Sequence, residues 1–209
     1  MMKQLTSLML SIPGLLLALS MHEFAHGYAA YKMGDNTAKY DGRLSLNPLD
    51  HMDPIGTLCL LFFHFGWAKP VRINPNNFRN QRAGIIVVSL AGPFMNFILA
   101  LLSAIAVEII STGMSYSNIA LFLYQVFLYS EVINIGLMVF NLIPIPPLDG
   151  SKVLLEFLPY RYRGYFYRME RYSFIILILL CYTGFLTPIL SVMQSSIGSL
   201  ISSIIGLIF

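Results

Sequence analysis

Long apolar runs alternate with polar stretches along this chain. Five runs read as membrane-spanning segments, at residues 5–33, 83–110, 119–143, 173–186 and 189–209. A further run, Ile55–Phe65, is shorter than the roughly 20 apolar residues that a spanning helix needs, and Gly66–Val71 closes it. We therefore expect an all-α polytopic membrane protein of about five to six apolar segments, folded as one domain over residues 1–209.

The composition agrees with a membrane protein. Charged residues make up 11% of the 209 residues and hydrophobic residues 56%, and the mean hydropathy is +0.69. A soluble domain carries about 25% charged residues. The two cysteines, Cys59 and Cys181, both lie in apolar runs, which argues against a disulfide scaffold and against a thiolate zinc site.

Basic residues are distributed unevenly, and this predicts the orientation. Lys3 precedes the first span, seven of the 13 Lys and Arg lie from Lys32 to Arg82, and the remaining five lie from Lys152 to Arg171. Positively charged loops stay on the cytoplasmic side. We therefore expect both basic loops in the cytoplasm and the 111–118 turn outside. The segment at about 55–71, with cytoplasmic loops on both sides, should enter the membrane and return.

The first apolar run contains the pentapeptide His22-Glu23-Phe24-Ala25-His26. Histidines four apart lie on one face of a helix and can share a metal ion, while the intervening glutamate is placed to act on a water molecule there. Polar groups this costly inside a membrane segment indicate function. His22 lies about 25 Å from the outer end at 1.5 Å per residue, so we expect the site in the cytoplasmic half of the membrane.

A catalytic zinc has three protein ligands and one open position. The other histidines, His51 and His64, lie in the loop and the short run that follow. A third ligand from a later segment must therefore be a carboxylate, with these candidates: Glu108, Glu131, Asp149, Glu156 and Glu170. Asp149 is favoured, because three prolines before it block a regular helix and Gly150 permits a sharp turn. Glu131 remains the alternative ligand, and His51 is more simply a loop histidine.

These motifs together resemble the site-2 protease family of intramembrane zinc metalloproteases. The histidine motif is followed by Asn-x-x-Pro-x-x-Pro-Leu-Asp-Gly at residues 141–150. Ala91–Asn96 matches the family's Gly-Pro-x-x-Asn element, and Gly66–Val71 resembles its membrane-associated loop. The resemblance covers roughly residues 15–155. The chain looks like a short, minimal member without a PDZ or nucleotide-sensing domain, and Ser151 stands where a second glycine is common.

The resemblance implies specific roles for five residues. One zinc ion would be bound by His22, His26 and Asp149. Glu23 would be the general base, and Asn141 a polar group near the scissile carbonyl. The implied function is hydrolysis of peptide bonds within the transmembrane segments of membrane proteins, as in regulated intramembrane proteolysis.

The expected setting follows from the same features. We expect an integral multi-pass protein of a prokaryotic cell membrane, with its active site toward the cytoplasm. Its partners would be a transmembrane protein or peptide and the lipid bilayer, not nucleic acid, and no oligomeric state is predicted. Arginines at 161–171, interleaved with tyrosines, fit anionic lipid headgroups better than nucleic acid.

Two other functions remain open at this point. A metal-ion transporter would use the same ligands, but residues 83–110 offer few polar groups for a path, namely Ser89, Asn96, Ser103 and Glu108. A catalytically inactive scaffold would not need Glu23 and both histidines. For Gly92-Pro93 the alternative is a turn at the start of a helix, with Asn96 as an interhelical hydrogen-bonding group.

Overall fold

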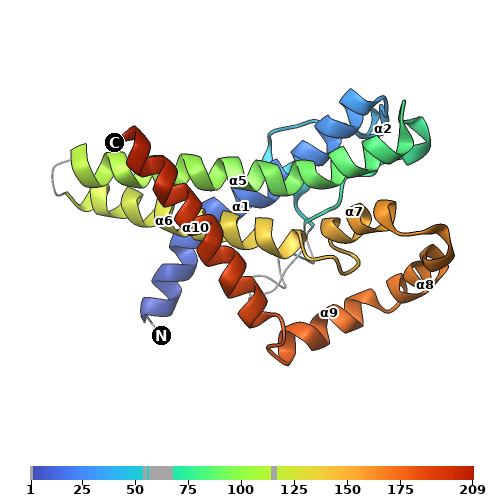
Figure 1. The fold of residues 1–209 in the computed structure, drawn as a ribbon. Coiled ribbons are helices and arrows are strands. Elements are labelled where there is room, and N and C mark those ends of the chain that lie inside the picture. Colours follow the sequence, from blue (N-terminus) through green and yellow to red (C-terminus); the bar gives the residue numbers. More distant parts are fainter. Residues whose placement is uncertain (1, 54–55, 57–67, 114–116) are drawn as a thin grey trace.

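The computed structural model describes residues 2–53, 56, 68–113 and 117–209. Regular structure in this part of the chain is helical, with one isolated antiparallel bridge between Met52 and Ala68 (Figure 1). The elements, in chain order, are α1 (Met2–Met33), α2 (Thr37–Tyr40), α3 (Pro48–His51), the 3₁₀ turn η1 (Pro75–Asn77), α5 (Gln81–Gly113), α6 (Asn118–Asn141), α7 (Asp149–Phe157), α8 (Tyr160–Glu170), α9 (Ser173–Tyr182) and α10 (Thr187–Ile208).

Four of the described helices are long and apolar enough to cross a membrane: α1, α5, α6 and α10. They correspond to the predicted segments at 5–33, 83–110, 119–143 and 189–209. The run at 173–186 instead forms the ten-residue helix α9, which covers only about 15 Å at 1.5 Å per residue. Because a bilayer core is about 30 Å thick, α9 is too short to cross it by itself.

The centre of the molecule is a bundle of α1, α5 and α6, which α10 crosses (Figure 1). One core cluster is formed by Ala100 and Ala104 of α5, Ile135 and Val139 of α6, and Ile201 of α10. Small side chains let helices approach closely, which is how helices associate in lipid, where the hydrophobic effect contributes little between them. The bundle therefore provides closely spaced helices on which a buried site can be built.

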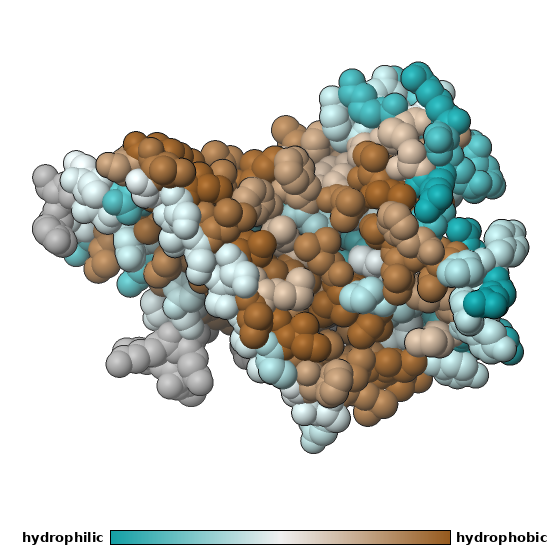
Figure 2. Space-filling view, viewed as in Figure 1, coloured by the Kyte–Doolittle hydropathy of each residue, from teal (hydrophilic) through white to brown (hydrophobic). Residues whose placement is uncertain are grey.

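Polar and apolar side chains are separated along the long axis of the molecule. Hydrophilic side chains gather at the end formed by α2, α7 and α8, while apolar side chains cover much of the visible face over the bundle (Figures 1 and 2). Large apolar side chains such as Leu102, Phe122 and Val192 are more than half exposed. An apolar surface of this extent marks contact with a membrane.

The two predicted basic loops are more ordered than the charge pattern indicated. The 152–171 stretch, expected to be a loop, forms most of α7 and all of α8, and the stretch after α1 contains α2 and α3. Helical spacing of apolar residues is the signal that the charge count overlooked: Tyr162, Tyr165, Phe166 and Met169 share one face. Most of the predicted re-entrant segment, residues 55 and 57–67, and part of the outer turn, residues 114–116, lie outside the described residues.

Candidate metal centre

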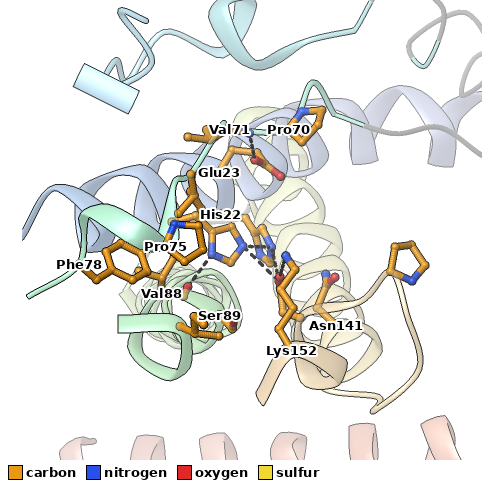
Figure 3. Close-up of a pocket in the computed structure, with 15 residues that line it drawn as sticks. His22, Glu23, Pro70, Val71, Pro75, Phe78, Val88, Ser89, Asn141 and Lys152 are labelled. Atoms are coloured by element: carbon orange, nitrogen blue, oxygen red, sulfur yellow. Dashed lines mark hydrogen bonds and ion pairs between the residues drawn. The ribbon is translucent and has the colours of Figure 1, made fainter. Parts of the chain in front are cut away.

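The three residues proposed as metal ligands converge in the structure (Figure 3). The Nε2 atoms of His22 and His26 are 3.0 Å apart. Asp149 Oδ2 lies 3.2 Å from the first and 3.1 Å from the second. The three residues are 7%, 6% and 5% exposed, although α1 supplies two of them and α7, more than a hundred residues later, supplies the third.

The hydrogen bonds on the far side of each imidazole indicate which atoms the cluster would present to a cation. His22 Nδ1 lies 2.6 Å from Asn96 Oδ1, and His26 Nδ1 lies 2.7 Å from the Val88 carbonyl oxygen. Since both partners are acceptors, each Nδ1 must donate its proton. In neutral imidazoles both Nε2 lone pairs then point at one another and at a carboxylate oxygen. Two nitrogens and one oxygen converging in this way match the donor set of a catalytic zinc.

Gly92 explains why α5 can approach the two histidines. A Cβ at this position would lie 2.5 Å from His22 Cε1 and 2.5 Å from His26 Nε2, closer than van der Waals contact allows. Gly92 and Pro93 lie inside α5 rather than before it, so the interpretation as a turn at the start of a helix is wrong. The Gly-Pro pair provides close packing against the metal centre.

Asn96 continues the site inward through a buried polar chain. Its Oδ1 accepts from His22, and its Nδ2 donates to the Ala18 carbonyl at 3.2 Å and to Asn134 Oδ1 at 2.9 Å. Asn134 in turn donates to the Ser130 carbonyl at 2.8 Å. Both asparagines are fully buried. Asn96 is therefore an interhelical hydrogen-bonding group and a partner of His22 at once.

The sequence reasoning did not single out Asn134. An amide inside the apolar run of α6 was the available signal, since an unsatisfied polar group in lipid costs several kcal/mol. What the sequence lacked was the register that sets α6 against α5 at this residue.

Asp149 is presented by the break between α6 and α7. Helix α6 ends at Asn141, the proline-rich segment follows, and Asp149 is the first residue of α7. Gly150 has a helical conformation here and is needed for a different reason than a sharp turn: a Cβ would overlap the Leu142 carbonyl. Close contact between α7 and the end of α6 therefore sets the position of the carboxylate.

Lys152, another residue that the sequence reasoning missed, fixes the second oxygen of this carboxylate. Its Nζ lies 3.0 Å from Asp149 Oδ1, which leaves Oδ2 to face the histidines. Burial by itself would raise the pKa of Asp149, but the adjacent His22 and His26 side chains and the Lys152 ammonium group outweigh it. The pKa therefore lies below its ordinary value, which favours the ionised carboxylate that a metal ion would need.

A cavity of about 400 Å³ opens beside the cluster. It is lined by the three ligands, by Glu23, Asn141 and Lys152, and by the segment from Pro70 to Phe78. Glu23 accepts a hydrogen bond of 2.9 Å from the Val71 backbone N–H, so its carboxylate points toward the 70–78 segment (Figure 3). Asn141 donates one amide hydrogen to the Leu137 carbonyl at 3.0 Å and has a second hydrogen on the same nitrogen.

Asp35, just after α1, holds the 70–78 segment over this cavity. The fully buried carboxylate accepts from the Thr37 backbone and hydroxyl, from the Asn74 backbone at 2.7 Å and from the Asn77 side chain at 2.8 Å. Burial raises the pKa of Asp35, but these hydrogen bonds more than compensate and lower it below the ordinary value. The carboxylate thereby connects the end of α1 to the segment that contacts Glu23.

The other candidate ligands lie elsewhere in the described residues. Glu131 is half-buried on α6 and does not belong to the three-residue cluster. Glu156 pairs with Arg163 at 3.6 Å. His51 is the buried last residue of α3 rather than a loop histidine, and its Nε2 donates to the Ser45 carbonyl at 2.8 Å. His64 lies outside the described residues.

Comparison with known proteins places these motifs in a broader context. The profile described as Peptidase family M50 matches residues 107–183, a region that includes Asp149 and excludes the histidine pentapeptide. "Putative zinc metalloprotease YwhC" of Bacillus subtilis is 39% identical over 205 residues, covering 91% of this chain and 90% of that protein.

Similarity extends to mycobacterial proteins named "Putative zinc metalloprotease Rip2". The Mycobacterium tuberculosis protein is 31% identical over 147 residues, covering 68% of this chain and 55% of that protein. The Mycolicibacterium smegmatis protein is 28% identical over 182 residues, covering 83% and 67%. No solved structure matches this chain.

Proposed function

This chain belongs to peptidase family M50, the site-2 proteases, and we propose that it is an intramembrane zinc metalloprotease that hydrolyses peptide bonds within transmembrane segments of other proteins. The observation that carries this proposal is the convergence of His22 Nε2, His26 Nε2 and Asp149 Oδ2 beside a cavity that Glu23 also lines. The curated relatives named as zinc metalloproteases support the choice of metal.

The metal would be one zinc ion per chain, held by His22, His26 and Asp149. When bound, zinc polarises a peptide carbonyl and makes water acidic enough to act as a nucleophile near neutral pH. Glu23 accepts the proton from the attacking water and delivers it to the leaving amine. The Val71 N–H, 2.9 Å from Glu23 Oε2, holds one oxygen and leaves the other to take the proton.

Two further residues would organise the cavity. Asn141, with one amide hydrogen free of the bond to Leu137, donates to the carbonyl oxygen as negative charge develops on it. Lys152 keeps Asp149 Oδ1 occupied, so the carboxylate contributes its other oxygen to the ion. Because Asn141 would donate only where charge develops, it would lower the activation barrier more than it strengthens substrate binding.

The substrate would be a transmembrane helix that unwinds before it is cut. The three ligands are buried to more than 90%, so a scissile bond can reach them only in a segment that has left its helix. Unpaired backbone groups in lipid cost several kcal/mol each. Residues that weaken a helix, such as Gly or Pro, lower that cost when they lie near the cut.

The cleavage site would lie toward the cytoplasm. Twelve of the 13 basic residues lie in the stretches 32–82 and 152–171, and positively charged segments stay on the cytoplasmic side. These two stretches include α2, most of α7 and all of α8, which lie at the polar end of the molecule in Figure 1. The setting that we propose is a prokaryotic cell membrane, in line with the bacterial relatives.

Cleavage of a single-span peptide by the purified protein in detergent tests this function. We expect cleavage that stops when a chelator removes the metal, returns when zinc is added back, and is absent in Glu23→Gln despite retained zinc. Zinc uptake into vesicles without any cleavage would indicate a transporter instead. Peptide binding that is unaffected by Glu23→Gln and never followed by cleavage would indicate an inactive scaffold.

A further inference from the structure

Helix α8 has two chemically distinct faces. Tyr162, Tyr165, Phe166 and Met169 are spaced three or four residues apart and share one face. Arg161 and Arg168 border this face, and Arg171, the C-cap residue of α8, lies on the opposite side. An aromatic and apolar face bordered by basic residues is the pattern of a helix that lies in the plane of a membrane surface.

The apolar face of α8 is open. Tyr162, Tyr165 and Met169 are 43%, 62% and 48% exposed. The exposed apolar surface continues into α9, where Phe174 and Ile175 are 53% and 60% exposed. The open face of α8 and the apolar surface of α9 thus follow one another along the chain.

The basic residues of α8 carry more positive charge than their surroundings neutralise. Four arginines and one glutamate lie between Tyr160 and Tyr172. Arg163 pairs with Glu156 of α7, whereas Arg161, Arg168 and Arg171 form no ion pair with another described residue. These three side chains are exposed, and α8 lies at the hydrophilic end of the molecule (Figures 1 and 2).

The arginines also lie close to the boundary between the two faces. The Arg161 guanidinium is 4.7 Å from the Tyr162 ring centroid, and that of Arg168 is 4.7 Å from the Tyr165 ring. Tyrosine rings concentrate at the headgroup level of membranes, and an arginine beside them can place its charge among phosphates while its stem covers the apolar layer.

We propose that α8 lies in the membrane–water interface and binds anionic lipid headgroups through Arg161, Arg168 and Arg171. Anionic phosphate is the complementary partner for these charges, and the adjoining apolar face of α8 and α9 favours a bilayer over a soluble polyanion. Nucleic acid would leave that apolar face exposed to water. The Arg163–Glu156 pair joins the lipid-binding helix to α7, whose first residue is Asp149.

Lipid-specific fluorescence quenching tests this inference without reference to protease activity. Trp67 is the single tryptophan of the chain, so Trp67→Phe with Phe166→Trp reports from the apolar face of α8. The full-length protein is reconstituted into vesicles that mix phosphatidylcholine with phosphatidylglycerol. Bromine, which quenches tryptophan, is placed on the acyl chains of one lipid or of the other at the same overall composition.

We expect quenching at least about two-fold stronger when phosphatidylglycerol carries the bromine, because each arginine near an anionic surface favours it by roughly five-fold. Arg161→Gln with Arg168→Gln and Arg171→Gln should abolish the difference, and so should high salt with the arginines intact. The charge-matched control Lys32→Gln, Lys39→Gln and Arg79→Gln should keep it.

Three results would overturn the inference. Equal quenching by the two lipids means that α8 does not select anionic headgroups. Absence of quenching by either lipid means that the helix is not at the interface. Equal loss in the α8 and control variants means that only the total charge of the polar end matters. Because the high-salt arm uses the protein with its arginines intact, the test holds even if the triple variant does not fold.

Discussion

The two sides of the metal centre are held in opposite ways. His22 and His26 are fixed from within the bundle, by Gly92 contact and by hydrogen bonds to α5 that continue to α6 through fully buried amides. Glu23, the neighbouring residue, faces the other way and is held by one backbone N–H of the 70–78 segment, where Pro70 and Arg72 are exposed.

Because the two sides are held differently, we expect the residues that determine metal affinity to be different from those that determine the cleavage rate. Helices packed through small residues and satisfied amides cannot move without leaving polar groups unpaired in lipid. The segment beside Glu23 is held instead by hydrogen bonds from Val71 to Glu23 and from Asn74 and Asn77 to Asp35, which are separate from the contacts that fix the two histidines. Substitutions on the bundle side should therefore change metal affinity, and substitutions on the segment side should change cleavage alone.

The largest expected effect is on the ligands themselves. His22→Ala and His26→Ala should lose the metal completely, and Asp149→Asn should weaken it strongly, because each removes one of three donors. Elemental analysis of the purified protein measures this. Glu131→Gln is the matched control and should retain one metal per chain. Loss of metal in that control, with retention in Asp149→Asn, would reverse the ligand assignment.

Replacement of the base should affect cleavage without affecting the metal. Glu23→Gln keeps the shape and the Val71 contact but cannot accept a proton. General acid–base catalysis contributes about 10²–10⁴-fold, so we expect a rate lowered by at least about a hundredfold. Peptide cleavage and bound zinc are measured on the same preparation. A smaller loss would contradict the role of Glu23.

The next largest effects are expected from substitution of the buried amides Asn96 and Asn134, and they should appear as weaker metal binding. Asn96→Ala removes the acceptor of His22 Nδ1, and partners of this kind are worth about 10–100-fold in metal affinity. Asn134→Ala acts one bond further away and should cost less. Ser103→Ala is the control, because Ser103 bonds Ser130 at 3.0 Å and contacts no ligand. Competition with a zinc chelator gives the zinc affinity of each variant. Equal affinities in all three variants would contradict the predicted role of the Asn96–Asn134 chain in holding His22.

The smallest effect is expected on the segment side. Asp35→Asn weakens the hydrogen bonds that hold the 70–78 segment, each worth about 1.5–3 kcal/mol when the acceptor is charged. We expect kcat/KM to fall by about ten-fold with zinc affinity unchanged. Asp41→Asn, which breaks the 3.0 Å pair with exposed Arg72, should change little. A shift in zinc affinity in Asp35→Asn would show that the two sides are not separate.

The same carboxylate predicts a pH dependence of stability. Because its hydrogen bonds lower the pKa of Asp35 in the folded chain, its contribution is complete above the unfolded value of about 3.9. That contribution is lost as the pH falls through the lower folded-state pKa. Acid unfolding followed in the wild type and in Asp35→Asn should therefore converge at low pH and differ at neutral pH.

Much of the fold and of the site could be predicted from local pattern. Apolar runs of sufficient length locate α1, α5, α6 and α10, since only a continuous helix satisfies its backbone in lipid. The four-residue spacing of His22 and His26 forces both imidazoles onto one face. Three prolines within four positions, 144–147, remove several backbone donors in a row and so disfavour continuation of α6, and Asp149 is presented just after this break.

Other features depend on contacts between residues far apart in the chain, and only the tertiary structure decided them. The sequence favoured Asp149 over Glu131 but left both open, and the packing of α7 against the end of α6 is what brings Asp149 to the histidines. Asn134 and Lys152 carry no motif, and their roles follow from the helix that lies opposite each of them. Local sequence specifies which residues share a helix face, because that depends on neighbours three and four positions away. Which face meets which is set by close packing at Gly92 and Gly150 and by the cost of leaving any buried amide unpaired.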